Sequence, residues 1–400
     1  MPTTTQPIPK WHKSSPLWPI PQNWEVLELR KIWDISSWGT PDTNNPKYRN
    51  WTINRCTPTD ITALGNSKYI FDTKIKITED WLKNSSAKIL PPNSIVVCTR
   101  ATIWKAVITK NEMTTNQWFK NIIPNSKIET DFLYYKMIFE EKNLMRLWNW
   151  STFLEVSKSD FEKLKISIPQ EKSEQHTIAT ILSTVDTTIQ QTQEIIEKLE
   201  LRNKRLQQNL LTGKIRLKGF SEKWETVELW DVLDYVQPTL YIVQSTEYDD
   251  KYKIPVLTAG KTFILWYTNE EEWIFQNDLP VIIFDDFTTA IKFVDFPFKV
   301  KSSAMKILKK KNVFDNIIYI YGAMQQIKYM IWGHERHWIS KYAYLTIPLP
   351  SPEEQKAIAD VFDIANQHIT QHKQKLEKLQ LLKRWLMQQL LTGKVRVKIK

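Results

Sequence analysis

The chain has 400 residues, of which 42% are hydrophobic and 25% charged, a composition typical of a globular protein with room for two or three domains. Lys and Arg outnumber Asp and Glu by 55 to 44, and the net charge of +11 favours a polyanion partner, nucleic acid before others. The chain has no run of eighteen apolar residues and its start, MPTTTQPIPK, has no apolar signal core. We therefore expect a cytoplasmic protein with no membrane partner.

In chain order, the pattern predicts six segments. An N-terminal tail (1–20) precedes a mixed block (21–170), in which 93–109 is rich in Val, Ile and Thr and reads as strand, and 131–142 as a short helix. A long helix (171–212) comes next. A second mixed block (213–350), with strands in 279–300, precedes a second long helix (351–392) and a C-terminal tail (393–400). Pro169 and Pro352 with their acidic followers suit helix starts.

The two long helices are copies of each other. The segment Glu174–Ala179 recurs as Glu354–Ala359, an offset of 180 residues that continues without insertion to Leu-Leu-Thr-Gly-Lys at 210–214 and 390–394. Upstream, Trp24-Glu25 recurs as Trp224-Glu225. The chain is therefore two halves, each a variable block followed by a common helix.

Each helix carries the a/d seam of a heptad repeat. The apolar seam positions are Ile178, Leu182, Val185, Ile189, Ile196, Leu199, Leu206 and Leu210 in the first copy and Ile358, Phe362, Ile369, Leu376, Leu379, Leu386 and Leu390 in the second. About forty residues at ~1.5 Å each make a rod of roughly 60 Å. The sequence predicts an α+β fold class, with two mixed α/β domains, an antiparallel coiled coil of the two long helices, and a pseudo-twofold repeat.

Signatures of catalysis are weak. Gly213-Lys214-Ile215 and Gly393-Lys394-Val395 lack the glycine-rich run and the Ser or Thr of a phosphate loop, and no GxGxxG element occurs. The segment His334–His337 has the wrong spacing for a zinc helix, and Cys56 and Cys98 are not spaced as metal ligands. We expect no metal site and two packed thiols.

One pair of carboxylates invites a nuclease interpretation. Asp285 and Asp286 precede Lys292 by a few residues, and paired carboxylates can hold Mg²⁺ while a lysine stabilises a phosphate. Adjacent residues of a strand point to opposite faces, so the two carboxylates converge only where the strand has ended or bulges. A strand-end turn or a base contact is the preferred alternative.

Basic and small polar residues alternate in the predicted loops. Lys and Arg suit phosphate contacts, and polar side chains suit base edges, although a solvated rim explains any one of them equally well. The candidate DNA-binding residues are Thr57, Thr59, Arg100, Lys105, Gln117, Lys120, Lys261, Thr262, Lys292, Lys301, Arg336 and His337.

Taken together, the motifs resemble the specificity subunit of type I restriction-modification enzymes, over nearly the whole chain. The features that carry the resemblance are Pro21–Val26 with its partial copy at Trp224, Gly39-Thr40-Pro41, Cys56–Ile61, Ser151-Thr152-Phe153, the Pro-x-x-x-Glu-Gln-x-x-Ile-Ala type of helix start and the Leu-Leu-Thr-Gly-Lys helix ends.

The resemblance implies a division of labour. Each block would be a target-recognition domain and the helices a conserved spacer, so that the chain reads a bipartite, asymmetric site in double-stranded DNA without being an enzyme. The chemistry would belong to partner chains: two modification subunits that methylate adenine with S-adenosylmethionine, and restriction subunits that use ATP and Mg²⁺. An antiparallel rod would set the unread gap. Two alternatives are a self-sufficient Mg²⁺-dependent endonuclease using Asp285 and Asp286, and a coiled-coil scaffold without DNA.

Tryptophan and glycine are out of balance. Gly numbers 8 and Trp 18, against a usual glycine share of about 7%. Compared with the family pattern, fifteen tryptophans stand where glycine is expected, which a single codon decoded as glycine in the source organism would explain. They are Trp11, Trp18, Trp33, Trp38, Trp51, Trp81, Trp104, Trp118, Trp148, Trp150, Trp230, Trp266, Trp273, Trp332 and Trp385, whereas Trp24, Trp224 and Trp338 fit the pattern as tryptophan.

Overall fold

The computed structural model describes residues 11–36, 52–65, 67–99, 105–141, 143, 157–258, 262–330 and 336–398. The chain forms two compact units, Met1–Glu194 with Gln374–Lys400, and Ile195–Lys373. Each unit therefore holds one mixed block together with part of both long helices.

The first unit is built on four small sheets, one of which is the pair β1-β2. A five-stranded sheet has the order β4-β11-β8-β9-β6, a three-stranded sheet the order β10-β5-β7, and β12 pairs with β3. The strands are β1 (His12–Lys13), β2 (Ile20–Pro21), β3 (Trp24–Glu28), β4 (Trp33–Ser36), β5 (Ile53–Cys56), β6 (Tyr69–Ile70), β7 (Ile75–Ile77), β8 (Ile95–Cys98), β9 (Ala106–Thr109), β10 (Met113–Thr115), β11 (Phe119–Pro124) and β12 (Lys165–Pro169).

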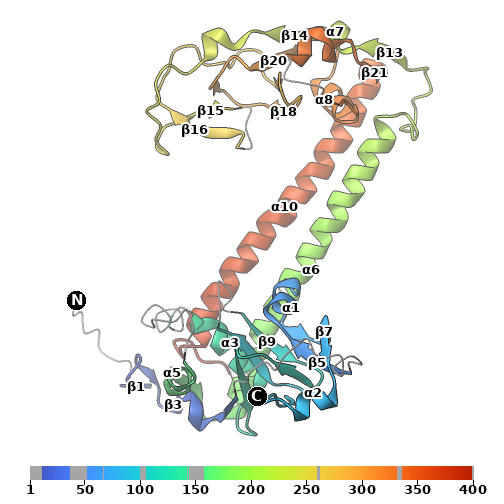
Figure 1. Ribbon diagram of the computed structural model, residues 1–400. Coiled ribbons are helices and arrows are strands. Elements are labelled where there is room, and N and C mark those ends of the chain that lie inside the picture. The colour runs from blue at the N-terminus through green and yellow to red at the C-terminus, as the bar shows by residue number, and fades with distance from the viewer. Residues whose placement is uncertain are drawn as a thin grey trace. The chain divides into compact units, whose positions relative to one another are not determined.

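Short helices connect the strands of this unit (Figure 1). They are η1 (Leu29–Lys31), α1 (Pro58–Ala63), α2 (Glu79–Lys83), α3 (Thr130–Phe139) and α5 (Lys158–Lys163). Helix α3 packs against β8 and β9, and its buried Phe132 and Tyr135 join Trp24 and Leu182 in the core of this unit. The block is thereby fixed to the beginning of the first long helix.

The second unit repeats most of this topology: its described strands lack only counterparts of β1, β2 and β6. Its sheets have the orders β14-β20-β17-β18, β16-β15-β19 and β13-β21, and the parallel pair β10-β5 of the first unit has its counterpart in the parallel pair β19-β15. The strands are β13 (Glu225–Glu228), β14 (Leu233–Val236), β15 (Ile254–Leu257), β16 (Ile264–Thr268), β17 (Val281–Asp285), β18 (Ile291–Val294), β19 (Lys299–Val300), β20 (Met305–Lys310) and β21 (Thr346–Leu349). Because the interiors of the two blocks differ in sequence, the repeated topology extends the duplication beyond the motifs.

The helices of the second unit follow the same plan. They are α7 (Leu229–Val232), η3 (Pro238–Tyr241), α8 (Ile317–Gln325), α9 (His337–Ser340) and η4 (Tyr342–Tyr344). Helix α8 takes the position of α3, packing against β17 and β18 (Figure 1). Gly322 of α8 lies so close to Leu211 that an added Cβ would sit 3.1 Å from its side chain.

The long helices are α6 (Lys172–Leu210) and α10 (Pro352–Leu390), close to the predicted bounds. Pro352 begins its helix as expected, whereas Pro169 ends β12 and α6 begins three residues later. The seam is buried at the helix ends, with Leu182 and Phe362 at 0% and 3% exposure. The predicted a/d pattern therefore lies on the buried face.

The two helices run antiparallel within each unit. In the first unit, Glu174 contacts Arg396 and Asp186 contacts Lys383. In the second, Glu200 contacts Lys373 and Asn203 donates to Asn366 at 2.8 Å. The Asp186–Lys383 and Asn203–Asn366 layers are equivalent under the 180-residue offset, and polar seam residues of this kind fix the register of a coiled coil.

Candidate nucleic-acid interface

The loops after three strands of the first unit meet at one edge. Strands β5 and β10 are parallel, so their C-terminal ends lie together, and Thr99, which follows β8, donates its backbone N–H to the carbonyl of Trp118 at 2.9 Å. Lys105 closes the β8–β9 loop by accepting the N–H of Cys98. We call this the first loop edge: residues 57–59, Thr99, Lys105 and 116–118.

The second unit has an equivalent edge. Strands β15 and β19 are parallel, and the N–H of Lys301 bonds to the carbonyl of Leu257 at 2.8 Å. Asp286 bonds to Ala304, and the N–H of His337 bonds to the carbonyl of Asp286 at 3.0 Å. We call this the second loop edge: residues 258, 262–263, 285–290, 301–304 and 336–337.

Most residues singled out in the sequence belong to these two edges or to the strands that enter them. Thr57 and Thr59 follow β5, and Thr262 follows β15. Lys105 lies in the β8–β9 loop, and Lys292 lies in the return strand β18 of the equivalent hairpin. Gln117 lies between β10 and β11, and Lys301 lies in the equivalent loop between β19 and β20. The fold therefore brings together residues that are far apart in sequence, and does so twice.

The described candidates differ in exposure. Thr59, Lys105, Thr262, Lys292 and Arg336 are exposed, and Thr57, Gln117 and Lys301 are half-buried. Two are fully inside: Lys120 at 3% and His337 at 0% exposure. Their side chains therefore support the edge from within, and His337 contacts Tyr329, with 3.1 Å between Nδ1 and the hydroxyl. Arg100 and Lys261 lie outside the described residues.

Several candidates are already oriented by neighbours. The Lys301 ammonium donates to the hydroxyl of Tyr248 at 3.0 Å, and the Lys105 ammonium to the carbonyl of Gly65 at 2.8 Å. The Lys292 ammonium lies 5.9 Å from the ring of Phe263. Cations held in this way can contact phosphates without first losing all of their side-chain freedom.

Thr57 has a structural task as well. Its backbone N–H and hydroxyl both donate to the carboxylate of Asp60, at 2.9 and 2.6 Å, in a capping box at the start of α1. Asp60 and burial together raise the pKa of the neighbouring Cys56 thiol, burial being the larger cause. This thiol is therefore kept protonated, and both cysteines are buried and unpaired by disulfide.

The carboxylates of Asp285 and Asp286 bind donors of the protein itself. Asp285 ends β17 and accepts from the N–H of Phe287 at 2.9 Å and the hydroxyl of Thr288 at 2.7 Å. Asp286 accepts from the N–H of Trp338 at 2.9 Å, and its other oxygen lies 3.7 Å from the Lys306 ammonium.

Both carboxylates are buried, at 5% and 1% exposure. Burial lowers the pKa of Lys306, and the charge of Asp286 opposes that shift. The pair thus fixes the β17–β18 hairpin against the start of α9, the strand-end turn that was the preferred alternative. Among the residues that the structure describes, no group of three or more His, Cys, Asp or Glu side chains is placed to hold a metal ion.

Two buried carboxylates at the helix starts were not singled out in the sequence. Glu174 accepts from the Trp24 indole and, at 2.7 and 2.9 Å, from the Arg396 guanidinium. Glu354 accepts in the same way from Trp224 and Arg216. The sequence did carry a signal for these carboxylates. The Glu-Gln pair and the upstream Trp both recur in the second half of the chain, and residues that recur together are expected to share a structural role.

The adjacent glutamines fix the block to the helix. Gln175 accepts the N–H of Glu129, which caps α3, and donates to the carbonyl of Pro169 at 2.9 Å. Gln355 does the same with Asn316, the cap of α8, and with Pro350. Each loop edge is thereby held in a set orientation to its own end of a long helix.

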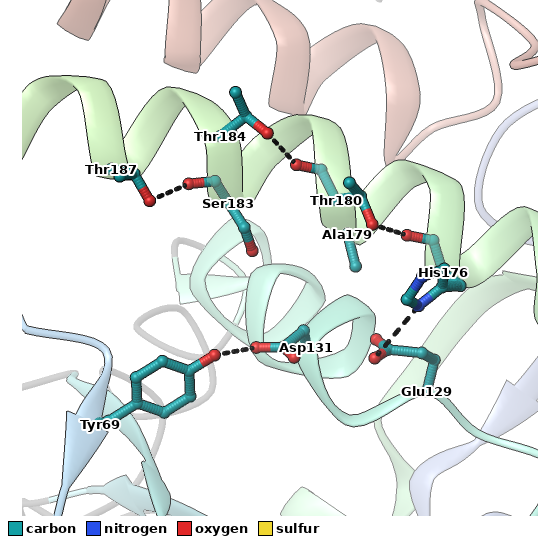
Figure 2. A pocket seen from close by; sticks show the side chains of 9 residues that line it. All are labelled: Tyr69, Glu129, Asp131, His176, Ala179, Thr180, Ser183, Thr184 and Thr187. Carbon is teal, nitrogen blue, oxygen red and sulfur yellow. Dashed lines mark hydrogen bonds and ion pairs between the residues drawn. The ribbon is translucent and has the colours of Figure 1, made fainter.

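A hollow of about 310 Å³ is lined by residues of β6 and α6 and of the start of α3, whose side chains are drawn in Figure 2. The Asp131 carboxylate in its wall is paired with Lys68 at 2.7 Å and accepts from Tyr69. The hydroxyls of Thr180, Thr184 and Thr187 donate to carbonyls of their own helix. Because the groups drawn are bonded to each other, this hollow presents few free donors to a ligand.

The fold defines a class of duplicated proteins. Each half has a mixed α/β block that carries a loop edge and is fixed to the start of a long helix. Residues 21–201 and 221–381 match the model of the "Type I restriction modification DNA specificity domain". The chain belongs to this family, and the resemblance found in its motifs is confirmed.

Known relatives agree with this assignment. The chain is 46% identical over 148 residues to the specificity subunit of the type I restriction enzyme EcoR124I/EcoR124II of Escherichia coli, a match that spans 36% of each chain. It is 27% identical to the putative MjaX specificity subunit of Methanocaldococcus jannaschii over 96% of this chain and 97% of that one.

Solved structures share the fold. The S subunit of the type I system of M. genitalium is similar with a TM-score of 0.57 at 15% identity, over 92% of this chain and 96% of that chain. The HsdS subunit of Thermoanaerobacter tengcongensis is similar with a TM-score of 0.52 at 13% identity. No helix within the described ranges is both long and apolar enough to cross a membrane.

Proposed function

We propose that this chain is the DNA-recognition subunit of a type I restriction-modification complex and that it reads a bipartite, asymmetric site in double-stranded DNA. The observation that carries the proposal is the repetition of one loop edge in both blocks with different side chains. A repeated frame with different loops is what two readers of two different half-sites require, because base recognition depends on which side chains reach the groove.

The distribution of charge and polarity supports the same role. Exposed Lys105, Lys292 and Arg336 suit phosphate contacts, and Thr59 and Thr262 suit base edges or further phosphates. The net charge of +11 strengthens the attraction to DNA at low salt. We include Arg100 and Lys261 among the DNA contacts on their sequence alone.

The catalytic work belongs to partner chains in this proposal. Two modification subunits would methylate adenine with S-adenosylmethionine, and restriction subunits would use ATP and Mg²⁺ to translocate and cut DNA. The chain itself would bind none of these cofactors. Such a complex acts on cellular DNA, which places the chain in the cytoplasm.

The family membership favours this function over the two alternatives. A self-sufficient endonuclease needs free carboxylates, whereas Asp285 and Asp286 are buried and bonded to the protein. A scaffold without DNA has no use for two equivalent loop edges that expose basic and polar side chains. Each alternative predicts a different outcome from the block exchange described next.

The test is an exchange of one block in the assembled complex. Residues 40–150 are replaced by the corresponding block of a family member with a known half-site, and methylated adenines are mapped in DNA treated with the reconstituted complex. We expect one half-site to change and the other to stay. A change in both half-sites, or methylation without sequence preference, would contradict independent readers.

A matched exchange of residues 236–312 should alter the other half-site. Its junctions fall at the end of β14 and after β20, so that α8 and both long helices stay unchanged. If neither exchange alters the methylated sequence while both complexes remain assembled, the chain is not the DNA reader.

A further inference from the structure

The described tryptophans differ in environment. Trp24 and Trp338 are fully buried, at 0% exposure, and Trp24 and Trp224 bond to the buried carboxylates at the helix starts. A second group exposes much of the indole, with Trp230 at 40%, Trp11 at 42%, Trp266 at 45%, Trp385 at 55% and Trp273 at 60%. A side chain as large and apolar as Trp gives little stability where half of it stays in water.

The backbone of Trp273 has a conformation that is typical of glycine. Its φ is +52°, one of three such angles at non-glycine positions among the described residues, beside Asn93 and Thr289. In this left-handed region the Cβ of an L-residue crowds the backbone, and glycine occupies it without that cost. An indole therefore gains nothing here that would offset the strained backbone.

The strain at Trp273 is imposed by its neighbours. The carbonyl of Glu272 accepts from the buried Lys299 ammonium at 2.7 Å, and Phe275 pairs with Phe298 through two backbone bonds. The chain on both sides of Trp273 is thus fixed by the core, and the intervening residue must turn in the left-handed sense. The exposed indole has no part in setting this turn.

Trp266 lies beside a bulge in an edge strand. Strand β16 pairs only with β15 in its sheet, and the register shifts where Val256 opposes Trp266 and Leu257 opposes Ile264. Glycine inside a strand commonly marks such a bulge. Trp266 lies within β16, and the case for glycine at this position is its place at the bulge.

Base stacking offers a different explanation for exposed indoles, and the placement of these two does not favour it. Strand β16 leaves the second loop edge at Ile264 and ends at Thr268, and Trp273 follows that far end. Trp230 lies on α7 and is stacked on Tyr344, in a different part of the unit. A shared DNA surface would gather the indoles at the loop edge.

From these observations we infer that Trp266 and Trp273 are glycines in the protein that its source organism makes, because one codon is decoded there as glycine. The overall composition, with 8 Gly and 18 Trp, is the expected result of such a codon. Trp24, Trp224 and Trp338 are genuine. Trp81 and Trp385 carry no part of this inference, since Trp81 is buried beside Arg55 and Trp385 lies inside α10, where glycine weakens a helix.

Mass spectrometry of the protein from its native cells tests the inference directly. Trypsin releases Thr262–Lys292 as one peptide that contains both positions and no internal Lys or Arg. We expect this peptide to be lighter by the difference between Trp and Gly residues, twice, while the tryptic peptide His337–Lys341, which contains Trp338, keeps its mass. Tryptophan at either Trp266 or Trp273 would overturn the inference at that position.

A pair of recombinant variants gives a second, physical readout. Trp273→Gly in the full chain should raise the temperature of unfolding by a few degrees, since it removes the left-handed strain, and Trp224→Gly should lower it because Glu354 loses a buried donor. A Trp273→Gly variant whose unfolding temperature stays level or falls would overturn the strain argument.

Discussion

The carboxylate of Glu174 accepts a hydrogen bond from the indole nitrogen of Trp24 at 3.2 Å, although the two residues are 150 positions apart. The second unit repeats the bond between Glu354 and Trp224 at 2.8 Å. Each carboxylate also binds an arginine from beyond the end of the opposite long helix, Arg396 or Arg216. One side chain at each helix start thus joins three separate segments of its unit.

Replacing Glu174 with Ala should lower the free energy of unfolding by about 2–4 kcal/mol, because it leaves the buried Trp24 indole N–H without an acceptor and removes the partner of Arg396. Urea unfolding followed by tryptophan fluorescence measures the change. Glu171→Ala is the matched control, since that side chain is exposed near the same helix start. Equal losses in both variants would argue against the three-way contact.

Asp286 should matter for stability and not for cleavage. Asp286→Ala removes the acceptor of the Trp338 N–H and leaves the Lys306 ammonium without its carboxylate, so we expect a loss of about 2–3 kcal/mol. Asp278→Ala, at a side chain that is 55% exposed, should cost little. Supercoiled DNA incubated with the purified chain and Mg²⁺ should remain uncut for both variants and the parent; nicking that disappears only in Asp286→Ala would restore the nuclease interpretation.

Lys292 should contribute a phosphate contact. In the assembled complex, Lys292→Ala should weaken DNA binding uniformly across sequences and make the slope of log K against log salt shallower by about one. Lys309→Ala serves as the control, because Lys309 lies toward the opposite end of β20 and pairs with Asp278. A loss confined to one DNA sequence would instead identify Lys292 as a base contact.

We expect the length of the long helices to set the gap between the half-sites. Insertion of one heptad into α6 keeps the spacing of the a and d positions along that helix, and should change the preferred gap without changing the bases of either half-site. Methylation of a library with variable gaps measures the preference. An insertion of three residues breaks the heptad and should abolish assembly; altered half-site bases with an unchanged gap would contradict the expectation.

The buried Lys136 should give stability a distinctive pH dependence. Burial lowers the pKa of its ammonium from the ordinary 10.5 to about 8, although the group donates to the Leu391 carbonyl at 2.8 Å. Between these two values the unfolded chain holds a proton that the folded chain has lost, so the stability that Lys136 contributes rises with pH, by at most about 1.4 kcal/mol per unit. Below pH 8 its desolvation cost is fully present.

A comparison with Lys136→Met isolates this effect from the tyrosines that titrate in the same range. The unfolding free energy of the parent minus that of the variant should rise from pH 8 to pH 10. The same difference for Lys158→Met, at an exposed lysine, should stay flat. A flat difference for Lys136→Met would mean that this lysine keeps its proton throughout.

The sequence alone determined the duplicated order, the bounds of the long helices and the family. These are local properties: a heptad pattern and a helix start are written in neighbouring residues, and the 180-residue offset repeats them. The candidate DNA residues were found in the same way, as basic and polar positions in loops. That reasoning could not separate exposed Lys292 from buried Lys120, since both stand next to strand residues of similar composition.

Only the tertiary structure decided which of these residues belong together. The parallel pairing of β5 with β10 and of β15 with β19 gathers loops that lie far apart in sequence into two equivalent edges. The ion pair between Arg396 and Glu174, which are 222 positions apart in the sequence, fixes one helix end to its block. Contacts at such separations depend on how the strands and helices pack, and no local pattern in the chain specifies them.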